Sequence, residues 1–188
     1  MNIYRLKRPI DTYEVIDFDI FQFAENLGDE QLTLVRSQPR TNESLLGRWG
    51  DVVCSISKEY QGKTLPSISF WGSYLIFTQK AFIALSDRLS EYGEFLPINA
   101  DGNELFIFNC LTFGQEDKEL CEKIFEDGYE VGLKSLHFHS VDVADKLIFK
   151  SQLLGPQSLL AIEEFKRMYE TCGLDGVIFD ADLLNPFS

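Results

Sequence analysis

The uncharged stretch Leu65-Pro-Ser-Ile-Ser-Phe-Trp-Gly-Ser-Tyr-Leu-Ile-Phe-Thr78 is rich in β-branched and aromatic residues, which predicts a buried strand. Residues Gln79 to Tyr92 follow it, and their apolar side chains recur three or four positions apart. This spacing predicts a helix whose buried face carries Phe82, Leu85, Leu89 and Tyr92. Thr78 is suited to the N-cap of that helix and Gly93 to its end.

A hairpin is predicted directly after this helix. Phe95-Leu-Pro-Ile-Asn99 and Glu104-Leu-Phe-Ile-Phe-Asn-Cys-Leu111 flank the dipeptide Asp101-Gly102. Asp-Gly between two apolar runs is a strong signal for a two-residue β-hairpin turn. The region from Leu65 to Thr112 therefore predicts a strand, helix and hairpin around which the rest of the chain is organised.

Weaker patterns precede this unit. Ile3 to Leu6 predicts a first strand, ended by Pro9, while Asp17 to Leu27 fits either a short strand or a helix. Leu32 to Val35 reads as a short strand in a polar loop. Ser44 to Tyr60 could begin as a helix, although its two glycines weaken that prediction.

An acidic segment follows the hairpin. Leu120, Cys121, Ile124 and Phe125 form an apolar stripe, and Gly128 is a stop signal, so a short amphipathic helix is expected. Its acidic side reads either as a solvated face or as a docking surface. The docking residues would then be Glu116, Asp117, Glu119, Glu122, Glu126 and Asp127.

The C-terminal third predicts two further strands, a helix and a last strand. The strands are expected over Leu133–Val143 and Lys146–Lys150, and the helix over Ser158–Cys172, with Gly173 ending it. Leu174 to Asp180 returns as a strand, and a loose tail containing Pro186 follows Asp182. We therefore expect a mixed α+β domain with a mostly antiparallel sheet and a few packed helices.

Length and charge limit the classes of function. A chain of 188 residues with 45% hydrophobic residues predicts one folded domain over residues 1–188. The net charge of −13 argues against direct binding of nucleic acid or anionic membranes and is compatible with a basic protein partner. No secretory signal or membrane span is recognisable, so a cytoplasmic location is expected. The four scattered cysteines are expected to be buried free thiols.

The sequence contains no recognisable catalytic or phosphate-binding motif, so no cofactor is expected. His137 and His139 lie two residues apart, which on a strand would put both on one face, but no third metal ligand is evident and no metal site is predicted. Asp175, Asp180 and Asp182 cluster near a strand end. These carboxylates or the histidines would serve the alternative function, a small enzyme acting on a cationic or neutral substrate.

Several segments in order resemble a known family. They are the Leu65-Pro66 lead-in with its strand and helix, Phe95-Leu-Pro-Ile98, Leu105-Phe-Ile-Phe-Asn109, Leu147-Ile-Phe-Lys150, Glu164-Phe-Lys166 and Gly173-Leu-Asp-Gly-Val-Ile-Phe179. This order resembles the immunity-protein family typified by a myxobacterial member, found beside polymorphic and type VI secreted toxins. Residues 61–182 would be the family-like core and residues 1–60 a lead-in.

The resemblance implies a small cytoplasmic protein that binds and neutralises a cognate toxin, with no catalytic residues of its own. An excess of acid suits a basic toxin, such as a nuclease. We therefore expect an acidic face to mask a basic toxin surface or active site. A regulatory or adaptor domain is the second alternative after the enzyme.

Overall fold

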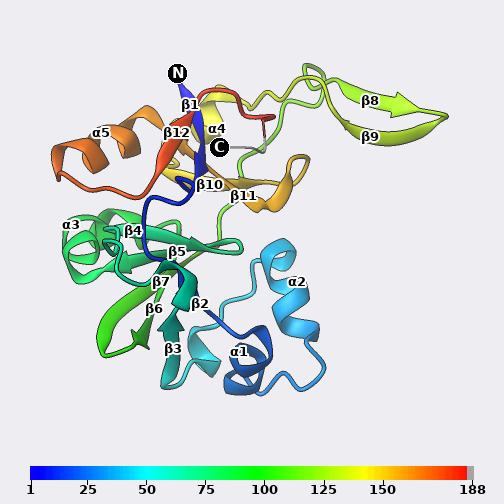
Figure 1. Cartoon of the computed structure of the whole chain (residues 1–188). Coiled ribbons are helices and arrows are strands. Elements are labelled where there is room, and N and C mark those ends of the chain that lie inside the picture. The colour runs from blue at the N-terminus through cyan, green and yellow to red at the C-terminus, as the bar shows by residue number, and fades with distance from the viewer. Residues whose placement is uncertain (186–188) are drawn as a thin grey trace.

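The unit predicted from residues 65–112 supplies four adjacent strands of the six-stranded sheet, up to one of its edges (Figure 1). The structure is a computed structural model and describes residues 1–185. The unit consists of β4 (Ile68–Trp71), β5 (Tyr74–Thr78), α3 (Gln79–Leu89), β6 (Gly93–Ala100) and β7 (Asn103–Cys110). The uncharged stretch is two strands rather than the single one predicted, because Gly72 adopts a φ of 57° and turns the chain back on itself.

Helix α3 begins as predicted and ends earlier than predicted. The Thr78 hydroxyl accepts a hydrogen bond from the Ala81 amide, and the helix stops at Leu89. Gly93 is therefore not its end but the first residue of β6. A Cβ at Gly93 would lie 2.3 Å from the carbonyl oxygen of Asn109, so the close approach of β7 requires glycine there.

The predicted β6–β7 hairpin is confirmed. Asp101 and Gly102 have φ values of 49° and 87°, as a type I′ turn requires. The six-stranded sheet has the order β2-β3-β6-β7-β5-β4, with β2 at Ile16–Asp17 and β3 at Val52–Ile56. Strand β3 runs parallel to β6, and the other neighbouring strands are antiparallel.

A second, four-stranded antiparallel sheet joins the two ends of the chain. Its order is β10 (Ile148–Ser151), β11 (Gly155–Ile162), β1 (Ile3–Lys7) and β12 (Ile178–Asp180). The helix predicted from Ser158 is wrong in its first five residues, because residues 158–162 belong to β11. Four consecutive apolar residues, 159–162, are buried there, as is typical of a strand covered on both faces. Helix α5 (Glu163–Thr171) follows, and Gly173 with a φ of 57° lies just beyond its end.

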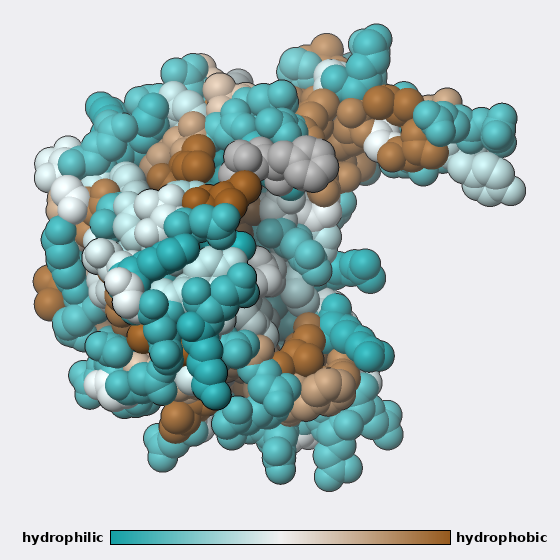
Figure 2. All heavy atoms as spheres, in the orientation of Figure 1, coloured by the Kyte–Doolittle hydropathy of each residue, from teal (hydrophilic) through white to brown (hydrophobic). Residues whose placement is uncertain are grey.

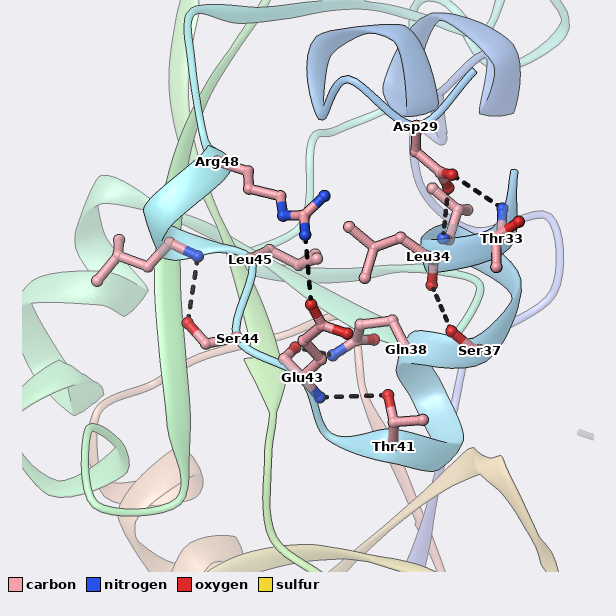
Figure 3. A network of polar contacts seen from close by, with 12 residues as sticks. Asp29, Thr33, Leu34, Ser37, Gln38, Thr41, Glu43, Ser44, Leu45 and Arg48 are labelled. Carbon is pink, nitrogen blue, oxygen red and sulfur yellow. Dashed lines mark hydrogen bonds and ion pairs between the residues drawn. The ribbon is translucent and has the colours of Figure 1, made fainter. Parts of the chain in front are cut away.

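The N-terminal region is more helical than predicted. It contains α1 (Ile20–Asn26), α2 (Thr33–Thr41) and two short 3₁₀ turns, η1 (Leu46–Arg48) and η2 (Lys58–Tyr60). The predicted strand at residues 32–35 is wrong, because Asp29 accepts hydrogen bonds from the amides of Thr33 and Val35 and so starts α2 (Figure 3). The helix that could begin at residue 44 is reduced to the 3₁₀ turn η1, and the segment continues as β3.

Two apolar cores lie on opposite faces of the six-stranded sheet. Along β5, Leu75 and Phe77 belong to one core and Tyr74 and Ile76 to the other. The first core also contains α3, α5 and the four-stranded sheet, and the second contains α1 and α2. Residues 1–60 are thus an integral part of both layers and not merely a lead-in.

The remaining elements lie between β7 and β10. They are β8 (Lys123–Glu126), β9 (Tyr129–Leu133) and the short helix α4 (Ser140–Val143). Of the loose tail predicted after Asp182, residues 183–185 continue the described chain, and Asp182 accepts hydrogen bonds from the amides of Leu184 and Asn185. Pro186 lies outside the described residues.

The close approach of Gly176 to the start of β4 yields a test of the packing between the C-terminal loop and the large sheet. Gly176 has a φ of +97°, and a Cβ there would lie 2.0 Å from the carbonyl oxygen of Ile68. We expect Gly176→Ala to lower the free energy of unfolding by about 2 kcal/mol or more, measured by urea denaturation. Gly47→Ala is the control, because Gly47 faces open space at an ordinary φ. Equal stability of the two variants would contradict this packing.

Candidate functional site

A two-stranded hairpin projects from the body of the molecule (Figures 1 and 2). We call residues 119–135 the arm; it contains β8 and β9, which pair antiparallel from Lys123 opposite Leu133 to Glu126 opposite Tyr129. Its base is closed by hydrogen bonds from the Glu122 amide to Ser135 Oγ and from Ser135 Oγ to the Leu120 carbonyl, each 2.9 Å long. Within residues 1–185, β8 and β9 belong to no larger sheet.

The arm corrects the prediction of an amphipathic helix. Asp127 and Gly128 have φ values of 51° and 84°, which is the same turn conformation as in the central hairpin. The signal was present in the sequence, since Asp127-Gly128 separates Lys-Ile-Phe-Glu from Tyr-Glu-Val. The apolar stripe expected to be buried is largely exposed, as Leu120 and Phe125 show with 57% and 60% exposure.

Apolar side chains cover much of the arm surface (Figure 2). Tyr129 is 77% exposed, and the other exposed large apolar residues of the arm are Leu120, Ile124, Phe125 and Val131. An isolated two-stranded hairpin is at best marginally stable in water, and clustered exposed apolar groups mark interaction sites. The arm therefore has the exposed apolar surface that is typical of interaction sites.

The arm is also acidic. Carboxylates outnumber ammonium groups five to two between residues 119 and 135. Lys134 pairs with Glu122 at 2.6 Å and Lys123 with Glu130 at 2.8 Å, which leaves Glu119, Glu126 and Asp127 without an ion pair in residues 1–185. Four of the six predicted docking residues, namely Glu119, Glu122, Glu126 and Asp127, are exposed on the arm.

The other two predicted docking residues lie at the foot of the arm. Glu116 is buried, and its carboxylate accepts hydrogen bonds from Ser151 Oγ and from the amides of Gln152 and Leu153. It holds the turn between β10 and β11, so the expectation that it faces solvent is wrong. Asp117 is half-buried and lies 3.7 Å from the imidazole of His139.

An open cleft of about 680 Å³ lies beside the foot of the arm, lined by residues 113–119, His139 and Gln152.

The strand predicted over residues 133–143 is wrong beyond Leu133. Strand β9 ends at that residue, and helix α4 begins at Ser140. His137 and His139 are therefore on a loop and not on one face of a strand. Residues 1–185 contain no group of three His, Cys, Asp or Glu side chains placed to hold a metal ion.

The three C-terminal carboxylates have separate structural partners. Asp175 accepts a 2.7 Å hydrogen bond from the Ser67 amide, and Asp180 pairs with Lys7. Asp182 accepts hydrogen bonds from backbone amides of its own turn. Each carboxylate therefore holds a loop or a strand end in place.

The cysteines are free, and burial of all four was expected. Cys110 is buried, Cys54 and Cys121 are half-buried, and Cys172 is exposed, so the expectation is wrong for Cys172. Burial raises the pKa of Cys110 to about 11 and that of Cys54 to about 12. Both thiols are protonated at neutral pH and are poor nucleophiles.

The fold and the arm together define a mixed α+β protein with a projecting acidic and aromatic hairpin. No protein-family model matches the chain, and no curated protein matches it. Among residues 1–185, no helix combines the length and apolar character needed to cross a bilayer.

The position of Glu116 yields a prediction about stability. Glu116→Ala removes the acceptor for one hydroxyl and two backbone amides, so we expect a loss of about 2 kcal/mol in the free energy of unfolding. Glu119→Ala changes an exposed neighbour and should stay within about 0.5 kcal/mol of the parent chain. Comparable losses in both variants, measured by chemical denaturation, would refute the buried role of Glu116.

The Asp175 contact predicts a pH dependence. Burial raises the Asp175 pKa, but the hydrogen bonds from Ser67 and the charge of Lys80 outweigh it, so the pKa lies below the ordinary value of 3.8. The stabilisation is therefore present above about pH 3.8 and is lost as the pH falls through the lower folded-state pKa. We expect Asp175→Asn to cost about 1 kcal/mol at pH 7 and progressively less below pH 3.8.

Urea denaturation of both chains at a series of pH values measures this difference. Asp87→Asn, on the exposed side of α3, is the control, and its difference in stability from the parent chain should not shrink as the pH falls. A difference between parent and Asp175→Asn that stays constant down to the lowest pH would contradict the assignment.

Proposed function

We propose that this chain is an immunity protein of the cytoplasm that binds a cognate secreted antibacterial toxin and masks a basic surface or active site, such as that of a nuclease. The observation that carries the proposal is the arm, whose exposed aromatic and acidic side chains stand clear of the body (Figure 2). The resemblance of the ordered segments to toxin-associated immunity proteins supplies the class of partner.

The aromatic residues of the arm are suited to anchor a partner. Tyr129 and Phe125 lie on the two strands close to the turn, and both are more than half exposed. Aromatic side chains that become buried at the centre of an interface supply much of its affinity. Because Glu126 is directly opposite Tyr129 in the hairpin, a carboxylate stands next to this anchor. A basic partner would meet both in one contact.

Backbone groups add a second mode of contact. Each strand of the arm uses one edge for the other strand, and within residues 1–185 the outer edges pair with nothing. An extended segment of a partner can add to such an edge through main-chain hydrogen bonds. The acidic side chains then select a basic partner, because opposite charges speed encounter and like charges disfavour wrong partners. A regulatory adaptor would use the same arm, and the identity of the partner separates the two functions.

The proposal predicts that a secreted toxin is encoded beside this chain, and the direct test uses that protein. Its C-terminal region is expressed in bacteria with and without this chain, and growth and co-purification are measured. We expect growth to be rescued and a stable complex to be recovered. Unrelieved toxicity without a complex would reject this pairing, and a complex without rescue would reject immunity while retaining a binding role.

The aromatic anchors are tested in that complex. Replacing Phe125 and Tyr129 together by Ser should weaken binding at least about tenfold in calorimetry, because both anchors are lost. The matched control replaces Ile83 on α3 and Val53 on β3 by Ser, two side chains of the large-sheet region that are 69% and 54% exposed. A control that weakens binding equally would show that the arm is not the interface.

The acidic residues are tested by association kinetics. The variant Glu119→Gln, Glu122→Gln, Glu126→Gln and Asp127→Asn should associate about tenfold more slowly at low salt and depend less on salt. A control with the same change in charge, made at Glu25, Glu30, Glu59 and Asp87, should retain most of the parent rate. Unchanged rates in the arm variant would remove these carboxylates from the interface.

A further inference from the structure

A cluster of arginines lines a second cleft, of about 410 Å³, between α2 and the turn that joins β10 to β11. The lining cations are Arg5 on β1 and Arg36 and Arg40 on α2, and Gln157 and Ser158 on β11 add polar side chains. We propose that this cleft binds a small polyanion carrying at least two phosphate or carboxylate groups. This site is separate from the arm and does not rest on the proposed immunity function.

The charges of the two helix arginines are not compensated by protein. Arg36 and Arg40 lie one turn apart on α2 and are exposed, so their guanidinium groups repel each other. Within residues 1–185 neither makes an ion pair or a side-chain hydrogen bond. No residue that lines the cleft is acidic. In a chain of net charge −13, these unpaired positive charges make the cleft a local exception to the negative charge of the whole protein.

Arg5 is already fixed in position at the wall of the cleft. Its guanidinium donates to Ser158 Oγ at 3.0 Å and to the Leu183 carbonyl at 3.1 Å. Burial lowers the Arg5 pKa and outweighs the charges of the nearby Asp180 and Asp182, which raise it. A guanidinium that is held by the protein loses little freedom when an anion binds, and its fork of donors matches phosphate and carboxylate oxygens.

A buried ammonium group lies behind the cleft. Lys150 is only 1% exposed, and its Nζ donates a 2.8 Å hydrogen bond to the carbonyl of Pro39, a residue of the cleft wall. No carboxylate in residues 1–185 pairs with this lysine, and burial lowers its pKa to about 8. The positive field of Lys150 therefore adds to that of the arginines, and a bound anion would favour its charged form.

The cleft has room for more than one anionic group. A neighbouring hollow of about 580 Å³ shares Arg5, Gln157 and Ser158 with it and continues along β1 to Lys7 and Arg8. Lys7 is engaged by Asp180, but Arg8 is exposed. The basic side chains thus follow one continuous depression, which fits a ligand with two or more charged groups better than a single phosphate.

Binding is tested with the full chain and three probes: pyrophosphate, citrate and orthophosphate. We expect pyrophosphate or citrate to bind with a dissociation constant of about 1 mM or lower in calorimetry, and orthophosphate more weakly. Binding of pyrophosphate alone would identify a phosphate ligand, and binding of citrate alone a carboxylate ligand. Binding of both would identify a site that recognises negative charge without distinguishing the two groups. Absence of binding by pyrophosphate and citrate would overturn the proposal.

The location is tested by variants and by NMR. Arg36→Gln with Arg40→Gln should weaken binding about tenfold or more, whereas Arg48→Gln with Arg167→Gln removes equal charge elsewhere and should change it little. Amide shift changes on adding the bound probe should centre on residues 36–40 and 155–158. Equal losses in both double variants, or shift changes centred elsewhere, would show that the anion responds to overall charge and not to this cleft.

Discussion

The buried Lys150 joins three separate parts of the chain. Its amide donates to the Thr112 carbonyl at 2.8 Å, its carbonyl accepts from the Gly114 amide at 3.0 Å, and its side chain reaches Pro39 in α2. The segment leaving β7 is thereby bound to β10 of the second sheet, and α2 is bound to the same strand through the Lys150 side chain. Burying an ammonium group is costly unless its hydrogen bonds are made, so each of these contacts constrains the others. The packing is close, since a Cβ at Gly114 would lie 2.6 Å from the Phe149 ring.

A buried polar network fixes the same helix against the large sheet. Gln38 of α2 is fully buried, donates to Asn109 Oδ1 on β7 and accepts from the hydroxyl of Tyr74 on β5. Asn109 in turn donates to Glu94 on β6. Figure 3 shows Gln38 and Glu43 close to the C-terminal end of α2. Because buried polar groups hold one arrangement when all are satisfied, α2 and the arginines on it have a defined place. The arm, in contrast, is held to the body only at its foot.

Local signals in the sequence were sufficient where one turn type decides the structure. Asp101-Gly102 predicts the central hairpin. The identical dipeptide at 127–128 also forms a hairpin turn, but the apolar residues before it fit a helical stripe equally well, so the sequence predicts a helix that ends at Gly128. Residues 158–162 were misassigned for a related reason, since a run of apolar residues buried on both faces has no period of its own. The burial of Glu116 depends on a hydroxyl 35 positions away and on two amides 36 and 37 positions away, and such contacts are set by tertiary structure alone.

The four-stranded sheet also sets an order of events during synthesis. Strand β1 leaves the ribosome long before its neighbours, which are β11, ending at residue 162, and β12, beginning at residue 178. The six-stranded sheet and the core that contains α1 and α2 are complete by Cys110 and can form earlier. Strand β1 therefore has no partner strand until β11 has been made. Such long-range pairing is slow, and the four-stranded sheet is complete only after β12 has left the ribosome.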